Sequence, residues 1–287
     1  MLTPSVNTMK TNLNKLSSLS LLAMLGAASG FVASSASAAT LISEWNFDNA
    51  TDRLANTGST GDIHDGTGVG TLSYVDADFS TGFDSGQALD ISAASSAMRV
   101  GNSAIGDTDY DSTFDDLTSF SVSFWVMADA DQAVIDDAWA GIANKGNPDT
   151  PSGWVIRKKS NDNNARVEIN GVKTSIGNSF DAAWHHIVMT VDNSTDVSYY
   201  FDNGAAITNT VTYSAIATLP MVFGAHRDDG FRSLLNGQLD EIKIYSGVLD
   251  ATEVSNLYTT NAIPEPGSYA LLAGLAGMAF VMARRRI

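Results

Sequence analysis

The stretch "WHHIVMTVDNSTDVSYYFDNG", residues 184–204, carries clear strand and turn signals. It holds two runs of β-branched and aromatic residues, and the polar segment DNSTD separates them. Such a pattern is typical of two strands joined by a turn. Asn203 and Gly204 form a second hairpin signal, because the two central residues of such a turn need positive φ. The stretch therefore predicts an antiparallel strand pair that ends in a tight turn.

Two of the chain's four histidines stand side by side in this stretch. Adjacent side chains of a strand point to opposite faces, so His185 and His186 are not expected to bind one metal ion. Trp184 should share a face with His186, and Ile187 should share the other face with His185. We therefore expect a structural role, with one imidazole hydrogen-bonded at an edge of the sheet.

Other strand-length segments surround this hairpin and are separated by Gly, Asn and Asp. Their regular spacing over residues 41–258 predicts an all-β fold, a sandwich of two antiparallel sheets. Strict alternation in the last strand would group Leu239 with Glu241, and Asp240 with Ile242. The clearest segments are SFSVSFWVMA (119–128), GWVIRKK (153–159), ARVEING (165–171), PMVFGAH (220–226) and QLDEIKIYSG (238–247). The segment LDATEVSNLY (249–258) is helix-like, with Asp250 or Thr252 as its cap.

Composition excludes several classes of function. The chain has 287 residues, a net charge of −16 and no cysteine. It therefore cannot form a disulfide, a thiolate metal site or a cysteine nucleophile. The acidic charge argues against binding nucleic acid or an anionic membrane surface, because both are polyanions. No GxSxG, HExxH or P-loop motif occurs.

Both ends of the chain are typical of targeting segments. Residues 1–38 combine Lys10 and Lys15, a short apolar run and the small residues Ala36-Ser37-Ala38. This pattern predicts a secretory signal peptide cleaved after Ala38, the alternative being a retained membrane anchor. Residues 261–287 contain Pro264-Glu265-Pro266, a short apolar stretch and a basic end formed by Arg284, Arg285 and Arg286.

This C-terminal arrangement resembles the PEP-CTERM sorting signal of Gram-negative bacteria. The resemblance implies recognition by an exosortase, transient anchoring in the inner membrane through a hydrophobic helix, and release or retention at the cell surface. The arginines should hold the end of the helix on the cytoplasmic side. A plain C-terminal membrane anchor is the alternative.

The body of the chain, residues 39–260, resembles the LamG-like, concanavalin A-like lectin/glucanase superfamily. The resemblance implies one two-sheet jelly roll, a fold that hosts carbohydrate binding, adhesion, calcium binding and, in some branches, glycoside hydrolysis. Fold alone does not choose among these functions. The matching segments are WNFD (45–48), GQALDIS (86–92), FSVSFWV (120–126), IANKGN (142–147), residues 184–204, MVFGA (221–225) and residues 231–258.

The enzymes of this superfamily that resemble laminarinase carry acids at alternate positions of one strand, roughly E-x-D-x-x-E. Alternate positions project into one cleft, which places the two catalytic carboxyls about 5–5.5 Å apart in retaining enzymes. The nearest segment here is residues 238–243, where Gln238 and Lys243 stand in place of acids. Asp240 and Glu241 are adjacent and are expected to face opposite ways. We therefore expect no catalysis.

The resemblance also implies one structural Ca²⁺ that joins the first strand to the last. Asp48 and Asp240 match positions that often contribute ligands, so they are the candidate metal ligands. The alternative is that Asp240 hydrogen-bonds a neighbouring loop.

Sugar recognition combines an aromatic platform with a few polar groups. Trp139 and Trp154 are candidate platforms, and His226, Arg227 and Asp228 are candidate polar residues in a loop. The alternatives are that Trp154 belongs to the core and that the loop is merely solvated.

The expectation is an exported, non-catalytic domain of the bacterial envelope or extracellular matrix that binds a polysaccharide or exopolysaccharide, or mediates adhesion. The alternatives are a structural biofilm or floc matrix protein without glycan binding, and a laminarinase-like glycoside hydrolase.

Overall fold

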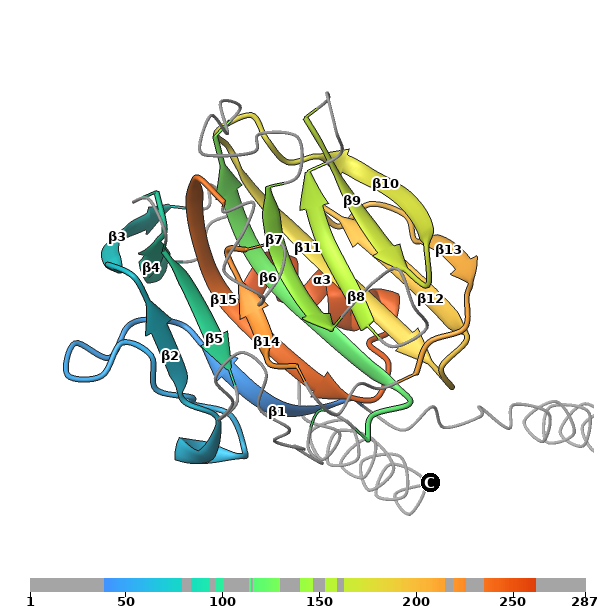
Figure 1. The fold of residues 1–287 in the computed structure, drawn as a ribbon, viewed down its shortest axis with the longest axis horizontal. Helices are drawn as coiled ribbons and strands as arrows, with labels where there is room; N and C mark the ends of the chain where they lie inside the picture. The colour runs from blue at the N-terminus through green and yellow to red at the C-terminus, as the bar shows by residue number, and fades with distance from the viewer. Residues whose placement is uncertain are drawn as a thin grey trace, which may run out of the picture. The chain divides into compact units, whose positions relative to one another are not determined.

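The computed structural model describes ten parts of the chain: residues 39–78, 84–92, 96–100, 114, 116–129, 140–146, 153–158, 163–214, 219–225 and 235–261 (Figure 1). The predicted signal peptide and sorting segment lie outside them. Among the described residues, no helix has both the length and the apolar character needed to cross a membrane.

The described strands form two antiparallel sheets, as the sequence predicted. Sheet A has eight strands, in the order β13-β12-β11-β6-β15-β4-β3, with β1 also paired to β15. These strands are β13 (Ile207–Thr210), β12 (Asp196–Phe201), β11 (Trp184–Asp192), β6 (Phe120–Ala128), β15 (Gly237–Ser246), β4 (Asp84–Asp90), β3 (Ser73–Asp78) and β1 (Thr40–Trp45).

Sheet B has seven strands and packs against sheet A (Figure 1). Its order is β10-β9-β8-β7-β14-β5-β2. The strands are β10 (Val172–Asn178), β9 (Asn164–Ile169), β8 (Gly153–Lys158), β7 (Gly141–Gly146), β14 (Met221–Phe223), β5 (Ala97–Val100) and β2 (Gly66–Val69). A short 3-10 helix, η1 (Gly61–His64), precedes β2.

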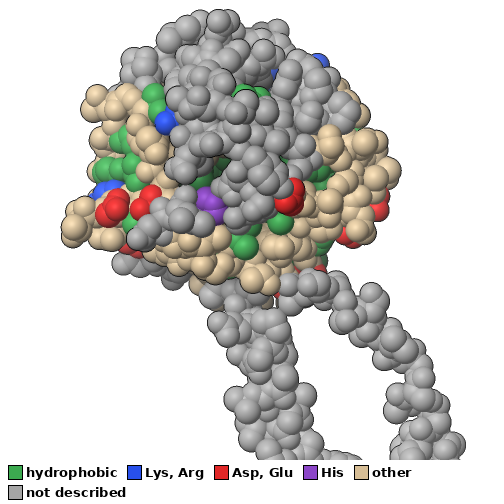
Figure 2. Space-filling model, turned by 60° about the horizontal axis from the view of Figure 1, so that its bottom comes forward, with side chains coloured by type: hydrophobic (Ala, Val, Ile, Leu, Met, Phe, Trp, Pro, Cys, Tyr) green, Lys and Arg blue, Asp and Glu red, His purple; other side chains and the backbone are tan. Residues whose placement is uncertain are grey.

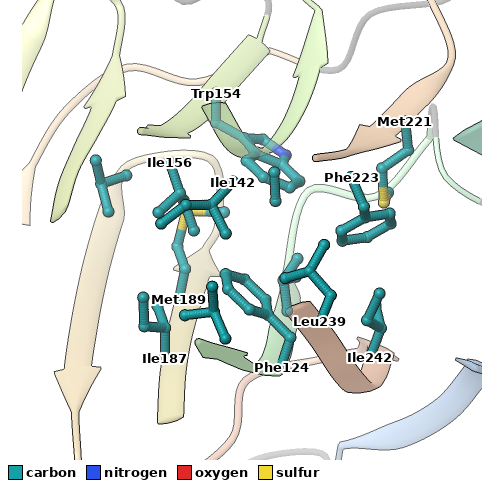
Figure 3. Close-up of a cluster of buried hydrophobic side chains, with 14 of the residues drawn as sticks. Phe124, Ile142, Trp154, Ile156, Ile187, Met189, Met221, Phe223, Leu239 and Ile242 are labelled. Atoms are coloured by element: carbon teal, nitrogen blue, oxygen red, sulfur yellow. The ribbon is translucent and has the colours of Figure 1, made fainter. Parts of the chain in front are cut away.

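The core lies between the two sheets. Side chains of Phe124 and Leu239 from sheet A meet Trp154 and Phe223 from sheet B, and all four are at most 1% exposed (Figure 3). The two sheets thereby remove a continuous apolar layer from water, which is the main stabilising contribution in such a sandwich.

Strand β15 departs from the predicted alternation. Its pairing with β6 shifts between Asp240 and Lys243, and Glu241 adopts a φ of 50°. The extra residue of this bulge places Leu239 in the core together with Ile242, not on the face of Glu241. The predicted grouping was therefore wrong, because a β-bulge inverts the alternation beyond it.

The hairpin after β12 is also shifted from its predicted position. Asp202 and Asn203 are the two central residues, with φ values of 48° and 58°, and the Gly204 N–H donates to the Phe201 carbonyl at 2.9 Å. Gly204 follows the turn and does not occupy its centre. Asp and Asn tolerate the left-handed conformation, so the turn forms one residue earlier.

The predicted helix is α3 (Ala251–Thr260), which packs on the outer face of sheet A, the face turned away from sheet B. Of the two candidate caps, Asp250 is the N-cap. Its carboxylate accepts from the backbone of Thr252 and Glu253, and the Glu253 carboxylate accepts from the Asp250 N–H. Val254 and Leu257 are buried against the sheet.

Candidate functional site

The neighbouring histidines have separate surroundings, as predicted. His185 lies at the edge of the sandwich, where its Nδ1 is 2.7 Å from Asp202 Oδ2 and its Nε2 is 3.0 Å from Asp181 Oδ1. Its ring stacks on Phe201 with centroids 4.8 Å apart. His186 points to the outer face of sheet A and is 2% exposed. The two imidazoles share no ligand set.

Electrostatics separate the two histidines further. Burial lowers the pKa of His186 to about 3, and the nearby Lys243 ammonium acts in the same direction. Burial also acts to lower the pKa of His185, but hydrogen bonds and charge from Asp202 and Asp181 outweigh it and raise that pKa above 6.5. His186 is therefore the neutral imidazole, and His185 is the histidine whose protonated form its surroundings favour.

A buried ionic cluster lies on the outer face of sheet A, where Lys243 is 3% exposed. The Lys243 Nζ is 3.1 Å from Glu241 Oε2 and 3.3 Å from Glu44 Oε1, and it donates to the Asn261 carbonyl at 3.1 Å. Burial raises the pKa of Glu241, while Lys243 and Asn261 oppose that effect. These contacts tie β1 and β15 to the end of α3, which indicates a structural role.

The same outer face carries a groove of about 470 Å³ that is open to solvent. Strand pairing builds its floor: Met127 of β6 lies opposite Trp184 of β11 on one side and opposite Gln238 of β15 on the other. The groove is lined by Val75, Asp76, Met127, Ala182, Ala183, Trp184 and Gln238.

Trp184 is the aromatic wall of this groove. It is half-buried and packs against a small apolar cluster that includes Trp125, Ala77 and Ala88. Asp76 is exposed, and its carboxylate accepts a hydrogen bond from the Gln87 amide. An anchored aromatic ring beside a carboxylate and the Gln238 amide can stack on an apolar ligand face and hydrogen-bond to hydroxyl groups.

Acidic residues outnumber basic residues in this protein, but their side chains are dispersed. Figure 2 shows acidic side chains spread over the face that it draws. Among the described residues that line the groove, Asp76 is the one charged group. On sheet B, by contrast, the buried carboxylate of Glu168 forms ion pairs with Arg157, Arg166 and Lys173. The groove is therefore a locally acidic site.

The structure places one of the predicted sugar-binding residues in the core. The Trp154 side chain is 1% exposed and points between the sheets towards Ile142 and Phe223 (Figure 3). This position agrees with the alternative that Trp154 belongs to the core. Trp139, His226, Arg227 and Asp228 lie outside the described residues.

The sequence reasoning missed Trp184 as a site residue because it was read only as part of a strand. The signal that points to it is its place at the very start of the strand, directly after Ala182 and Ala183. Small residues beside an aromatic ring leave room for a ligand at the end of a sheet.

The predicted calcium ligands have different environments. Asp48 is exposed, and its Oδ1 accepts from the Gln87 N–H at 2.8 Å. Asp240 is fully buried, and its Oδ1 accepts from the Glu241 N–H at 2.7 Å. Within the described parts of the chain, no group of three or more His, Asp or Glu residues is arranged to hold a metal ion. These two residues alone do not fit the six to eight oxygen ligands that Ca²⁺ requires, and a calcium ion bound by them stays a prediction.

Several solved structures share the fold. Domain 4 of AbnA, an extracellular arabinanase from Geobacillus stearothermophilus solved in complex with arabinotriose, is 20% identical with a TM-score of 0.54, over 77% of this chain and 98% of that one. The binding domain of Paraclostridial Mosquitocidal Protein 1 is 19% identical with a TM-score of 0.55, over 76% of this chain and 52% of that one.

The receptor binding domain of a botulinum neurotoxin C/D mosaic serotype is 14% identical with a TM-score of 0.55, over 76% of this chain and 51% of that one. The match thus spans about half the length of each toxin domain. At these identities the likeness shows the fold alone. No curated protein matches the chain.

Two family models match different parts of the sequence. The PEP-CTERM protein-sorting motif matches residues 262–286, which indicates a sorted, cell-surface-associated protein and implies an exosortase. The concanavalin A-like lectin/glucanases superfamily matches residues 101–255, more than half of the chain. The chain therefore belongs to the concanavalin A-like lectin/glucanase superfamily and ends in a PEP-CTERM sorting motif.

Proposed function

We propose that the protein is an exported, non-catalytic carbohydrate-binding domain of the cell envelope or extracellular matrix, and that an uncharged polysaccharide binds in the groove beside Trp184. The observation that carries this proposal is the combination of a half-buried indole with Asp76 and Gln238 in the lining of one open groove. Carbohydrate ligands present both an apolar C–H face and a ring of hydroxyls, and this groove offers a partner for each.

The indole supplies the larger part of the proposed interaction. Trp184 is half-buried and packs in the cluster around Trp125, so it loses little freedom when a sugar stacks on it. Gln238 lies opposite the floor residue Met127, and Asp76 lies on β3, which β4 separates from β15. Their oxygens and the Gln238 amide N–H groups can hydrogen-bond hydroxyls at different points along a bound polysaccharide and thereby fix its orientation.

The charge of the groove supports an uncharged ligand. Among the described residues of its lining, Asp76 is the one charged group, and none of them is a cation. A uronic acid or a sulfated sugar would bring a second negative charge against this carboxylate without a compensating Lys or Arg. The net charge of −16 adds a weaker, long-range repulsion of polyanions.

The carboxylates of the described structure support a non-catalytic role. Glycoside hydrolysis by the usual mechanisms needs two carboxyls that flank the scissile bond. The part of the groove lining that the structure describes contains one acidic residue, Asp76. The acids of β15 are buried, and the Glu241 carboxylate is paired with Lys243. The predicted sorting by an exosortase would place such a domain at the cell surface, where polysaccharide is the abundant ligand.

A calorimetric binding panel tests the proposal. Purified protein is titrated with neutral polysaccharides, including an arabinan and a β-glucan, and with an acidic polyuronate. We expect binding to at least one neutral chain, weak or no binding to the polyuronate, and no release of reducing sugar. The variant Gln238→Ala should weaken binding, while Ile207→Ala, a 38% exposed residue on edge strand β13, should not. Absence of binding throughout the panel would favour the matrix-protein alternative, and release of sugar would favour the hydrolase.

A further inference from the structure

We infer that His185 is a positioning residue for the groove and that its protonation makes ligand binding pH-dependent. When both ring nitrogens carry a proton, His185 ties the turn at residues 181–183, which forms one wall of the groove, to the hairpin turn at Asp202. This inference rests on the proposed function for its ligand, but its structural part can be tested without one.

The bridging geometry requires a charged imidazole. Nδ1 is 2.7 Å from a carboxylate oxygen of Asp202, and Nε2 is 3.0 Å from a carboxylate oxygen of Asp181. A carboxylate only accepts hydrogen bonds, and a neutral imidazole has one N–H. Both contacts can be hydrogen bonds at once only when His185 is protonated. Loss of the proton therefore breaks one bond and leaves a ring nitrogen lone pair facing a carboxylate.

Asp181 connects the protonation of His185 to the backbone that lines the groove. Its Oδ1 accepts from the Ala183 N–H at 3.1 Å, and its Oδ2 accepts from the Asn178 amide at 3.1 Å. The next residue, Ala182, holds a φ of 62°, and its N–H donates to the Ala128 carbonyl at 3.0 Å. The left-handed conformation is unfavourable for alanine, so the turn depends on the contacts that fix it.

The groove wall begins at this turn. Ala182 and Ala183 line the groove directly, and Trp184 follows them in the chain. A turn that shifts when Asp181 is released therefore moves two lining residues and loosens the backbone that positions the indole. His185 itself does not line the groove, so its effect on a ligand is indirect.

The groups that face His185 are few. Asp181 and Asp202 are the titratable groups that act on it, Phe201 of β12 covers its ring, and its partner across β6 is the apolar Val126. From the end of β10, Asn178 is neutral. The adjacent His186 has a pKa of about 3 and stays neutral in the relevant range. Among the described groups of this region, a transition at a pH above 6.5 can therefore be assigned to His185.

The direction of the effect follows from the two carboxylates. They raise the pKa of His185 above 6.5 against the opposing effect of burial. Both hydrogen bonds of His185 are therefore present at a pH below that raised pKa, and one of them is lost as the pH rises through it. Affinity for the ligand should fall over the same interval.

The structural test uses the full chain without ligand. Backbone amide signals of Ala182 and Ala183 and the indole signal of Trp184 are followed by NMR between pH 5 and 9, together with the ring signals of His185. We expect the chemical shifts of all these signals to change with one common midpoint above pH 6.5. In the variants His185→Gln and Asp181→Asn, the signals of Ala182, Ala183 and Trp184 should no longer show this transition. Amides that stay constant while the His185 ring titrates would overturn the inference.

The binding test uses whichever neutral polysaccharide of the panel binds. Affinity should fall roughly three- to tenfold from pH 5.5 to pH 8.5, because the loss of about one hydrogen bond corresponds to a change of this size. The His185→Gln variant should bind weakly at both pH values. The affinity of the His186→Gln variant should still fall between pH 5.5 and pH 8.5. A pH-independent affinity in the unmodified protein contradicts the inference. If no polysaccharide binds at any pH, the proposed function fails, and the amide titration still decides whether His185 holds the turn.

Discussion

The indole of Trp125 lies against the imidazole of His186, with ring centroids 5.1 Å apart, beneath Tyr258 of α3. His186 Nε2 is 2.8 Å from Ser123 Oγ, so one of these two groups donates to the other. The pair shows how the outer face of sheet A is used. Its central part is covered by aromatic rings and by α3, and the end at Trp184 forms an open groove.

The buried imidazole should make the protein sensitive to acid. Because the pKa of His186 is about 3 in the folded protein and about 6.5 when unfolded, only the unfolded state gains its proton between these values. Stability is therefore complete above pH 6.5 and is lost as the pH falls. The variant His186→Gln should lose less free energy of unfolding between pH 6.5 and 5 than the unmodified protein. Urea unfolding at these two pH values measures the difference, and equal losses would contradict the assignment.

The ionic cluster at Lys243 should be a sensitive point for stability. Lys243→Met leaves the buried Glu241 carboxylate without its ion-pair partner and removes the link to Asn261. Loss of one partner of a buried pair costs about 3–5 kcal/mol. The matched control is Lys173→Met, which removes a 47% exposed lysine side chain from its contact with Glu168 and should cost less than about 1 kcal/mol. Similar losses in the two variants would show that the cluster is not structural.

The capping box of α3 gives a smaller, local effect. Asp250→Ala removes the carboxylate that accepts from Thr252 and Glu253, so we expect a loss of about 0.5–2 kcal/mol. Asp250→Asn keeps an accepting oxygen and should restore most of the stability. Chemical denaturation measures both, and an unaffected Asp250→Ala variant would show that tertiary packing alone fixes the helix.

The sequence predicted the architecture because the fold depends on alternation and turn chemistry, which are local signals. The hairpin of β11 and β12, the opposite faces of His185 and His186, and the start of α3 all followed from such signals. The bulge at Glu241 did not, since a single residue in the left-handed region leaves no mark in a polar-apolar pattern. The hairpin turn was misplaced by one residue because Asp202 can adopt the conformation that was assigned to Gly204.

The site was less predictable than the fold. A tryptophan in a strand is equally consistent with the core and with an open wall, and only the packing of distant strands decides. Trp154 lies in the core, while Trp184 lies beside a groove that brings together Asp76 and Gln238, more than 150 residues apart in the chain. No local pattern contains that juxtaposition.

The contrast between these two tryptophans gives a further prediction. Trp154→Ala should remove about 3–5 kcal/mol from the free energy of unfolding, because it leaves a cavity among Ile142, Phe223 and their neighbours. Trp184→Ala should cost less, since its ring is partly exposed already. Thermal unfolding of the two variants compares them directly, and a larger loss for Trp184→Ala would contradict the assignment of core and groove.

The most direct test of the central claim is the affinity of Trp184→Ala for a neutral polysaccharide that the unmodified protein binds, measured by calorimetry at pH 5.5. Removal of a stacking indole should weaken binding by at least about tenfold, the value of a contact worth about 1.4 kcal/mol, without unfolding the protein. A folded Trp184→Ala protein that binds as tightly as the unmodified one would show that the groove beside Trp184 is not the carbohydrate site.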